Sequence, residues 1–382
     1  MMNRTGIYVH IPFCIKKCNY CDFISDSNYE LEDKYFEKLI SEIQYRGNED
    51  RKGNSSVSDR LINTIYFGGG TPSSVSSDYI KKVVNALKEK FNLANLEEMT
   101  IEVNPGTCNN DNIQDYYEMG FNRLSIGVQS FDEDMLKNIG RIHNRADIYK
   151  TVDIAHDAGF KNISIDLMYG LPEDSILRLK KDIELAMALN LQHISTYGLI
   201  VEEGTKFYDQ MNDGILILPE EDELLQMRDL INGKLLDQGF NRYEIANYAK
   251  AGYESKHNLI YWNNDDYYGF GVNSTTKVDD MRFMNETDIL KYIGSNEFEK
   301  YNLEEITEEM KIEEAIFLGL RLIEGINLVD FFNRYNINIK EKYTKVIDEL
   351  IDIKAMWLSD RTLRLTDYGF EISNYCLAKF LS

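Results

Sequence analysis

The sequence has few cysteines, five in 382 residues. A disulfide-stabilised secreted scaffold uses many more cysteines for its length, so this class of protein is excluded. Long apolar runs are also missing: none approaches the ~20 residues that a helix needs to cross a bilayer, and we expect no membrane span.

A recognisable secretion signal is missing as well. The apolar stretch 7–13 is too short for the core of a signal peptide, and it runs directly into a cysteine and two lysines. We therefore expect a cytoplasmic protein whose thiols stay reduced. In that compartment, clustered cysteines more often bind metal or do redox chemistry than form disulfides.

Basic residues are scarce relative to acidic ones. The chain has 42 Lys and Arg against 64 Asp and Glu, a net charge of −22. Such a field repels phosphate backbones, and we find no local basic patch that would overcome it, so we expect no nucleic-acid partner. The acidic residues are dispersed along predicted helices, as is typical of a solvated surface.

Apolar runs typical of strands alternate with amphipathic helical patterns through the first half of the chain. Each helical stretch is long enough to connect two parallel strands. Six strands do not complete an eight-stranded barrel, so the pattern predicts an α/β fold with an open, partial (β/α)6 barrel. The predicted strands are 6–11, 62–67, 99–103, 123–128, 163–167 and 193–200.

The alternation loosens after about residue 205. We assign 1–204 to the partial barrel, 205–302 to an extension rich in aromatic residues, and 303–382 to a smaller C-terminal domain. The last domain shows three helical patterns, two short strands and a closing helix, an order that resembles a winged-helix module. Its mean charge is not basic, so we expect it to pack on the barrel and not to bind DNA.

Polar or glycine-rich features follow five consecutive predicted strands. The C-terminal ends of parallel strands meet at one rim, where barrel-type α/β proteins keep their reactive groups, so we expect these features to converge. A buried carboxylate also requires a partner. A carboxylate residue that interrupts an apolar strand is therefore more consistent with a functional role than with a structural one. In chain order the features are Cys14 with Cys18 and Cys21, the glycines 68–70, Glu102, Gln129 and Asp166.

Three clustered thiols permit two interpretations from the residues alone. A structural zinc site normally needs four protein ligands, and His10 is the only nearby candidate for the fourth. A cubane iron–sulfur cluster has four irons, of which three cysteines bind three, leaving the fourth open to a small chelating ligand. The glycines at 68–70 suit close approach of such a ligand, and they are no P-loop because the lysine is missing.

The spacing Cys14-x-x-x-Cys18-x-x-Cys21 resembles the signature of the radical S-adenosylmethionine superfamily. Further segments resemble its coproporphyrinogen-oxidase-like branch, and within that branch the HemW-like heme chaperones. These segments include YFGGGTPS, RLSIGVQSFDEDMLKNIGRIH, IDLMYGLP, HISTYGLIVEEGT and YEIANYAKAGYESKHNLIYWNNDDYYGFG. The resemblance covers residues 7–271 and is specific.

The resemblance implies a role for each matching residue and assigns no catalytic side chain. The three cysteines would bind a 4Fe–4S cluster, with Tyr20 shielding their loop, and His257 in the HNxxYW segment would be a heme ligand. The cluster would pass an electron to bound S-adenosylmethionine and so generate a 5′-deoxyadenosyl radical. The S-adenosylmethionine pocket would be formed by Tyr8, Gly69, Gly70, Thr71, Glu102, Gln129, Arg141 and Asp166.

The implied function is a heme-binding chaperone that delivers heme, or another tetrapyrrole, to a recipient protein. The alternative is an oxygen-independent coproporphyrinogen III dehydrogenase or another radical enzyme of tetrapyrroles, so enzymatic activity stays open. Those dehydrogenases carry a fourth cysteine where this chain has Phe23, and their first strand begins later than residue 6. Both features favour the chaperone. The family's His-Ser-Tyr segment is replaced by other residues at 272–277, so the residue that would bind the heme iron stays open.

The remaining histidines and cysteines receive structural interpretations. His10 either approaches the cluster or is a polar residue on an alternating strand. His143 and His156 are expected on the surface, and His193 is expected to be structural. Cys108 and Cys376 are expected to be small side chains in or near the core.

Overall fold

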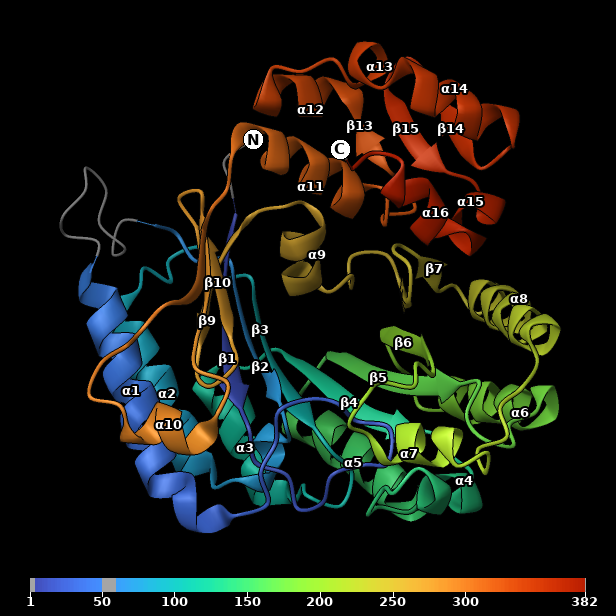
Figure 1. The fold of residues 1–382 in the computed structure, drawn as a ribbon. Helices are drawn as coiled ribbons and strands as arrows, with labels where there is room; N and C mark the ends of the chain where they lie inside the picture. The colour runs from blue at the N-terminus through green and yellow to red at the C-terminus, as the bar shows by residue number, and fades with distance from the viewer. Residues whose placement is uncertain (1–3, 50–59, 382) are drawn as a thin grey trace.

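The structure is a computed structural model in which residues 4–49 and 60–381 are described. The larger part of the chain is organised around one twelve-stranded sheet, whose strand order is β12-β11-β10-β9-β1-β2-β3-β4-β5-β6-β8-β7 (Figure 1). Its six central strands pair in sequence order and run parallel, as the sequence predicts. They are β1 (Thr5–Ile11), β2 (Thr64–Gly69), β3 (Glu98–Val103), β4 (Arg123–Gln129), β5 (Asn162–Tyr169) and β6 (His193–Gly198).

Helices connect these strands and cover one face of the sheet. The amphipathic helical patterns between the predicted strands are present as α1 (Glu32–Glu49), α2 (Ser77–Lys90), α5 (Arg145–Ala158) and α6 (Ile176–Met187), and a shorter helix, α4 (Glu133–Asn138), precedes α5. Another connecting helix, α3 (Asn110–Met119), buries Ile113, Tyr116 and Met119. That helix begins at a capping box in which Asn109 and Asn112 satisfy each other's backbone N–H groups.

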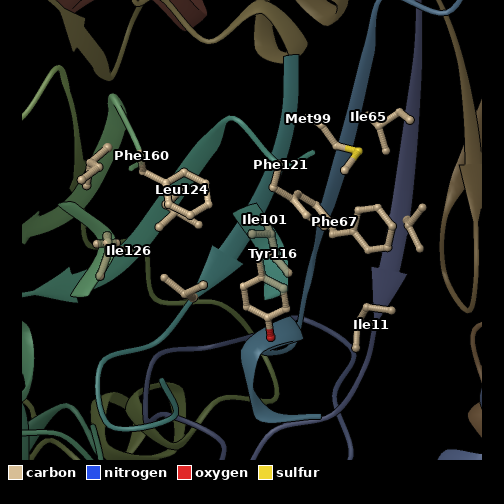
Figure 2. Close-up of a cluster of buried hydrophobic side chains, with 14 of the residues drawn as sticks. Ile11, Ile65, Phe67, Met99, Ile101, Tyr116, Phe121, Leu124, Ile126 and Phe160 are labelled. Carbon is tan, nitrogen blue, oxygen red and sulfur yellow. The ribbon is translucent and has the colours of Figure 1, made fainter. Parts of the chain in front are cut away.

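The core lies between the parallel strands and the helices. Successive strand residues point to opposite faces, so every second side chain faces the helices. Figure 2 shows Ile65, Phe67, Ile101, Leu124 and Ile126 packed in this layer, and all five are buried. Burial of this apolar surface is the main driving force for folding. The alternate positions face the barrel interior, where polar side chains can gather.

The aromatic-rich extension supplies both edges of the sheet, which the sequence pattern did not indicate. After α7 (Lys206–Asn212) and α8 (Glu221–Asp237), β7 (Asn241–Arg242) and β8 (Asn247–Ala249) add antiparallel strands beside β6. After α9 (Lys256–Trp262), β9 (Asp266–Phe270) pairs parallel with β1. β10 (Thr275–Val278), β11 (Met281–Met284) and β12 (Tyr301–Glu305) then extend that edge around α10 (Ile289–Gly294). These strands are too short to show periodicity.

The C-terminal residues form a second core around a three-stranded antiparallel sheet of order β13-β15-β14. The winged-helix-like order predicted from the sequence is present. The elements are α11 (Glu308–Gly319), β13 (Ile326–Asn327), α12 (Leu328–Tyr335), α13 (Ile339–Lys342), α14 (Thr344–Asp352), β14 (Met356–Leu358), β15 (Thr362–Leu365), α15 (Asp367–Glu371) and α16 (Ser373–Ala378). Within the described ranges, no helix is both long enough and apolar enough to cross a membrane.

One buried carboxylate ties α1 to the distant edge of the sheet. Glu42, with 0% exposure, accepts hydrogen bonds from Arg46 Nε at 2.9 Å and Asn285 Nδ2 at 2.7 Å. It also accepts from the Gly271 backbone N at 3.0 Å and the Tyr292 hydroxyl at 2.7 Å. A buried charge is tolerated only when it is fully partnered, as here. This network therefore fixes α1, the end of β9 and α10 against each other.

We expect Glu42→Ala to lower the free energy of unfolding by about 3–5 kcal/mol, because it removes the carboxylate at the centre of a buried, hydrogen-bonded network. Chemical denaturation followed by circular dichroism measures the change. Glu37→Ala, at an exposed position of the same helix, is the matched control and should change stability little. Equal stability of the two variants would contradict the structural role of Glu42.

Candidate functional site

The cysteine loop begins where β1 ends and is closed at its base by backbone pairing. Cys14 N donates to Asp26 O at 3.0 Å, and Asp26 N donates to Pro12 O at 2.7 Å. Cys14, Cys18 and Cys21 lie between these anchors as half-buried free thiols. The structure therefore places all three predicted ligands on one short loop at the C-terminal end of a central strand.

The middle of the loop is fixed by contacts with the end of α4. Asn19 N donates to Ile139 O at 2.9 Å, and its side-chain amide donates to Asn138 O at 2.7 Å. Gly140 permits this approach, since a Cβ there would lie 3.0 Å from Asn19 Oδ1. Tyr20 packs against an apolar cluster that includes Ile139. The loop is thus held at its centre as well as at its base.

The glycine-rich turn after β2 packs directly against the cysteine loop. Gly69 has φ +113°, and a Cβ there would lie 2.6 Å from the His10 ring. At Gly70, whose N donates to Ile11 O at 2.8 Å, a Cβ would lie 2.8 Å from Phe13 O. Only glycine fits such positions. The next residue, Thr71, places its hydroxyl 3.3 Å from Cys14 Sγ, so turn and loop form one surface.

Glu102 faces the interior from β3 and supports the glycine turn. Its carboxylate accepts hydrogen bonds from the Tyr66 hydroxyl at 2.8 Å and from Gly69 N at 3.2 Å. Burial raises the pKa of Glu102 to about 7, while the hydrogen bond from Tyr66 opposes the rise. A carboxyl group poised near neutrality can accept or donate a hydrogen bond to a ligand bound at the turn.

Asp166, Gln129 and Tyr8 complete the interior face near the rim. Burial raises the pKa of Asp166, opposed by a hydrogen bond from Ser195 and by nearby arginines. Gln129 ends β4 with φ +66°, where the register between β4 and β5 shifts as in a bulge. The Tyr8 hydroxyl lies 3.1 Å from His10 Nδ1. The predicted site residues that lie on strands therefore come from five adjacent strands and face the same barrel interior.

Arg141 brings a buried cation to the cysteine loop. Its Nη1 donates to Cys18 Sγ at 3.7 Å, and its Nη2 donates to Gly127 O at 2.5 Å and to the side chain of Asn104. Its Nε is buried without a hydrogen-bond partner. Asn104 in turn donates to Thr71 Oγ1 at 2.8 Å. Asn104, which follows β3, is not among the site residues that the sequence predicts.

Histidine placement differs in part from expectation. His10 is buried, its Nε2 lies 3.0 Å from Ile24 O, and burial lowers its pKa to about 4, so it anchors the end of the cysteine loop. The expectation that His143 is a surface residue is wrong: it is 4% exposed, with Nε2 3.2 Å from Val128 O. The turn between α4 and α5 folds His143 under the end of β4. His193 is buried at the start of β6.

His257 lies at the opposite end of the strands from the cysteine loop. Its Nδ1 is 2.7 Å from the hydroxyl of Thr64, the first residue of β2, and its Nε2 is 3.0 Å from the Tyr261 hydroxyl. The ring stacks on Tyr66 and is 1% exposed, and burial lowers its pKa to about 3. The structure therefore does not bring His257 together with the cysteines.

Arg123 is an interior residue that sequence reasoning missed. It is buried at the start of β4, with Nη2 3.4 Å from His193 Nδ1, and its charge opposes the rise in the pKa of Asp166. The available signal was the alternation in RLSIGV, where the arginine occupies an inward position.

The chain's own groups fit an iron–sulfur cluster with a small ligand beside it. Three thiols share a loop that contains no fourth cysteine, a guanidinium lies next to one thiol, and the glycine turn has no room for a Cβ. Thiolates need such positive partners, and an added iron centre supplies more. In the part of the chain that the structure describes, no three His, Cys, Asp or Glu side chains gather around a position for a single metal ion.

Two family models match the chain. Residues 8–186 match the Radical SAM superfamily, and residues 306–372 match the HemN C-terminal domain.

Relatives and one solved structure give full-length matches. The heme chaperone HemW of Lactococcus lactis subsp. lactis is 37% identical, covering 100% of this chain and 98% of that protein. HemW of Bacillus subtilis is 35% identical, with 98% of each covered. Coproporphyrinogen III oxidase HemN from Escherichia coli, described as a radical SAM enzyme, has a TM-score of 0.85 at 20% identity over 99% of this chain and 90% of its own, so it shares the fold.

The raised pKa of Glu102 predicts a pH dependence of stability. The folded state holds the proton up to about pH 7, whereas the unfolded carboxyl loses it near its ordinary value of 4.5. Stability contributed by the protonated carboxyl is therefore present below pH 4.5 and lost as pH rises to about 7, in total about 3 kcal/mol. In Glu102→Gln this loss should disappear, as measured by denaturation at pH 5 and pH 8. The exposed Glu118→Gln is the control, and parallel profiles for Glu102→Gln and wild type would contradict the prediction.

Proposed function

This chain belongs to the HemW family of the radical S-adenosylmethionine superfamily, and we propose that it is a heme-binding chaperone that delivers heme to a recipient protein in the cytoplasm. The observation that carries the proposal is the match to HemW chaperones over nearly the whole length of both chains. Because that match includes the C-terminal domain, it extends beyond the barrel shared throughout the superfamily.

We infer that Cys14, Cys18 and Cys21 hold a 4Fe–4S cluster through three of its irons. The turn at Gly69 and Gly70, where the backbone can approach a ligand closely, would hold S-adenosylmethionine beside the cluster. When bound, cluster and cofactor together supply reductive cleavage of the sulfonium C–S bond. The remaining contacts of the pocket come from Tyr8, Thr71, Glu102, Gln129, Arg141 and Asp166.

The surrounding side chains prepare this site. The Arg141 guanidinium donates to Cys18 Sγ and so offsets the negative charge that a thiolate-bound cluster carries. Tyr20 and the apolar cluster behind it keep water from one side of the loop. The carboxyl group of Glu102 accepts a hydrogen bond from the Gly69 amide and faces the barrel interior.

The alternative function is that of a coproporphyrinogen dehydrogenase, and its structural support is the fold shared with HemN. Phe23 argues for the chaperone, since a 62% exposed aromatic residue stands where the dehydrogenases carry their fourth cysteine. The heme ligand is a further part of the proposal. The resemblance predicts His257 as a ligand, but both ring nitrogens are already engaged by Thr64 and Tyr261, so iron binding would require one nitrogen to give up its partner.

We expect protein purified without oxygen to contain about four irons and four sulfides per chain. Cys14→Ala, Cys18→Ala and Cys21→Ala should each abolish the cluster, because the loop has no spare thiol. Cys108→Ala is the matched control, and its thiol instead lies 3.6 Å from Asn104 O. Iron and sulfide analysis with absorption spectroscopy measures the result. Stoichiometric zinc with little sulfide would overturn the cluster assignment.

The reconstituted protein should bind hemin tightly and should not convert coproporphyrinogen III to protoporphyrinogen IX under reducing, anaerobic conditions. Hemin titration followed by absorbance measures the first, and chromatography of the porphyrin products measures the second. The physical reason is that the chaperone stores its ligand unchanged, whereas the dehydrogenase must remove two carboxyl groups. Sustained decarboxylation would replace the chaperone assignment by the enzymatic one.

A further inference from the structure

A cavity of about 490 Å³ lies where the extension meets the C-terminal domain. Its lining residues come from the end of α9, from β9, β10 and β11, and from α11. Figure 1 shows α9 between the sheet and α11. Cavities of this volume hold small molecules of cofactor size. The HNxxYW segment forms one boundary, since its Tyr261 lines the cavity.

Aromatic and thioether side chains form one part of the walls, and carboxylate and cationic side chains form another. Tyr261 and Tyr267 meet edge to face, with ring centroids 4.8 Å apart. Phe317 and Met310 line the cavity from α11. Such surfaces suit a large planar ligand, because each aromatic face adds favourable stacking beyond the area it buries. Met310 and Tyr267 are also residue types that ligate heme iron.

Two cations stand together on the strand side of the cavity. Lys277 on β10 and Arg282 on β11 are directly opposed in the antiparallel register, so their side chains share one face. Both interact with the carboxylate of Glu314 on α11: Arg282 Nη2 donates to Oε1, and Lys277 Nζ lies 3.8 Å from Oε2. Glu314 Oε2 is buried and has no hydrogen-bond partner. The cavity therefore contains a carboxylate site that the chain fills incompletely with its own side chain.

We propose that this cavity holds the cargo: a planar tetrapyrrole lies against Tyr261, Tyr267 and Phe317, and its carboxylates replace Glu314 on Lys277 and Arg282. The inference rests on the proposed function and names the place where that function binds its ligand. A ligand carboxylate that takes the place of Glu314 gives the two cations a new negative partner. The partly exposed Glu314 side chain can turn toward solvent when it is displaced.

His257 is a positioning residue in this arrangement. Its Nε2 hydrogen bond holds the Tyr261 hydroxyl inside the barrel, and this fixes the ring that forms a wall of the cavity. The imidazole itself is 1% exposed and does not contact the ligand. The HNxxYW histidine thus acts on heme through Tyr261.

The first test fills the cavity. Leu318 lines it from α11, so Leu318→Trp should weaken hemin binding by the full-length reconstituted protein by at least about tenfold, as expected for loss of a well-packed ligand contact. Leu290→Trp, at an exposed leucine of α10 outside the cavity, is the matched control and should bind hemin like wild type. Circular dichroism and iron content verify that both variants are folded and carry the cluster.

The second test exploits the carboxylate exchange. Glu314→Gln should tighten hemin binding several-fold, because it removes the competing carboxylate from Lys277 and Arg282. Glu304→Gln is its matched control, since Glu304 accepts from the same arginine at 3.1 Å but does not line the cavity. Lys277→Met should weaken binding of hemin by about tenfold and leave binding of the dimethyl ester of hemin unchanged, since the ester has no carboxylates.

The third test separates positioning from iron ligation. His257→Ala should weaken hemin binding without shifting the absorption maxima of bound hemin, and His257→Gln, which can still hydrogen-bond Tyr261, should restore affinity. A shifted spectrum in His257→Ala would assign the imidazole to the iron and overturn its positioning role.

The outcomes distinguish the two proposals. If the wild-type protein fails to bind hemin, the proposed chaperone function fails. If wild type binds hemin and the Leu318, Glu314 and Lys277 variants bind it equally well, the function stands and the cavity assignment is overturned.

Discussion

The alternation of side chains along six parallel strands is the constraint on which the rest of this structure depends. One set of positions faces the helices and is apolar, and burial of that set holds the sheet and its helices together. The other set faces the interior and includes Tyr66, Glu102, Arg123 and Asp166. These polar groups are tolerated there because they partner one another and the glycine turn. Core and site are therefore two faces of the same strands.

The direction of the strands separates two regions of chemistry. The C-terminal ends of β1 and β2 carry the cysteine loop and the glycine turn, which pack together through Gly70 and Thr71. The opposite ends carry α9, whose His257 reaches Thr64 at the start of β2. A strand of β1's length separates two ends by about 20 Å. The cysteine loop and the aromatic segment consequently lie at distinct places on one scaffold.

The central fold and the rim of the site could both be predicted from the sequence, because both follow from the periodicity of the strands and helices. Long strands and helices show clear periodicity, and parallel strands bring their C-terminal ends together, so Cys14, Glu102 and Asp166 could be assigned to one rim. β7 to β12 escaped prediction because two to five residues carry too little pattern. The burial of His143 and the inward position of His257 depend on tertiary packing. Local sequence does not encode how a turn or a short helix docks.

The Glu42 network has a consequence for the order in which the molecule assembles. Its partners Gly271, Asn285 and Tyr292 are separated from it by 229, 243 and 250 residues along the chain. Until that later segment has left the ribosome, α1 carries a carboxylate without most of its partners, and β1 lacks its neighbour β9. Contacts of such long sequence separation require slow loop closure. Although α1 is synthesised early in the barrel, it is thus among the last of its helices to reach its final environment, and the nascent barrel stays open at that edge until β9 emerges.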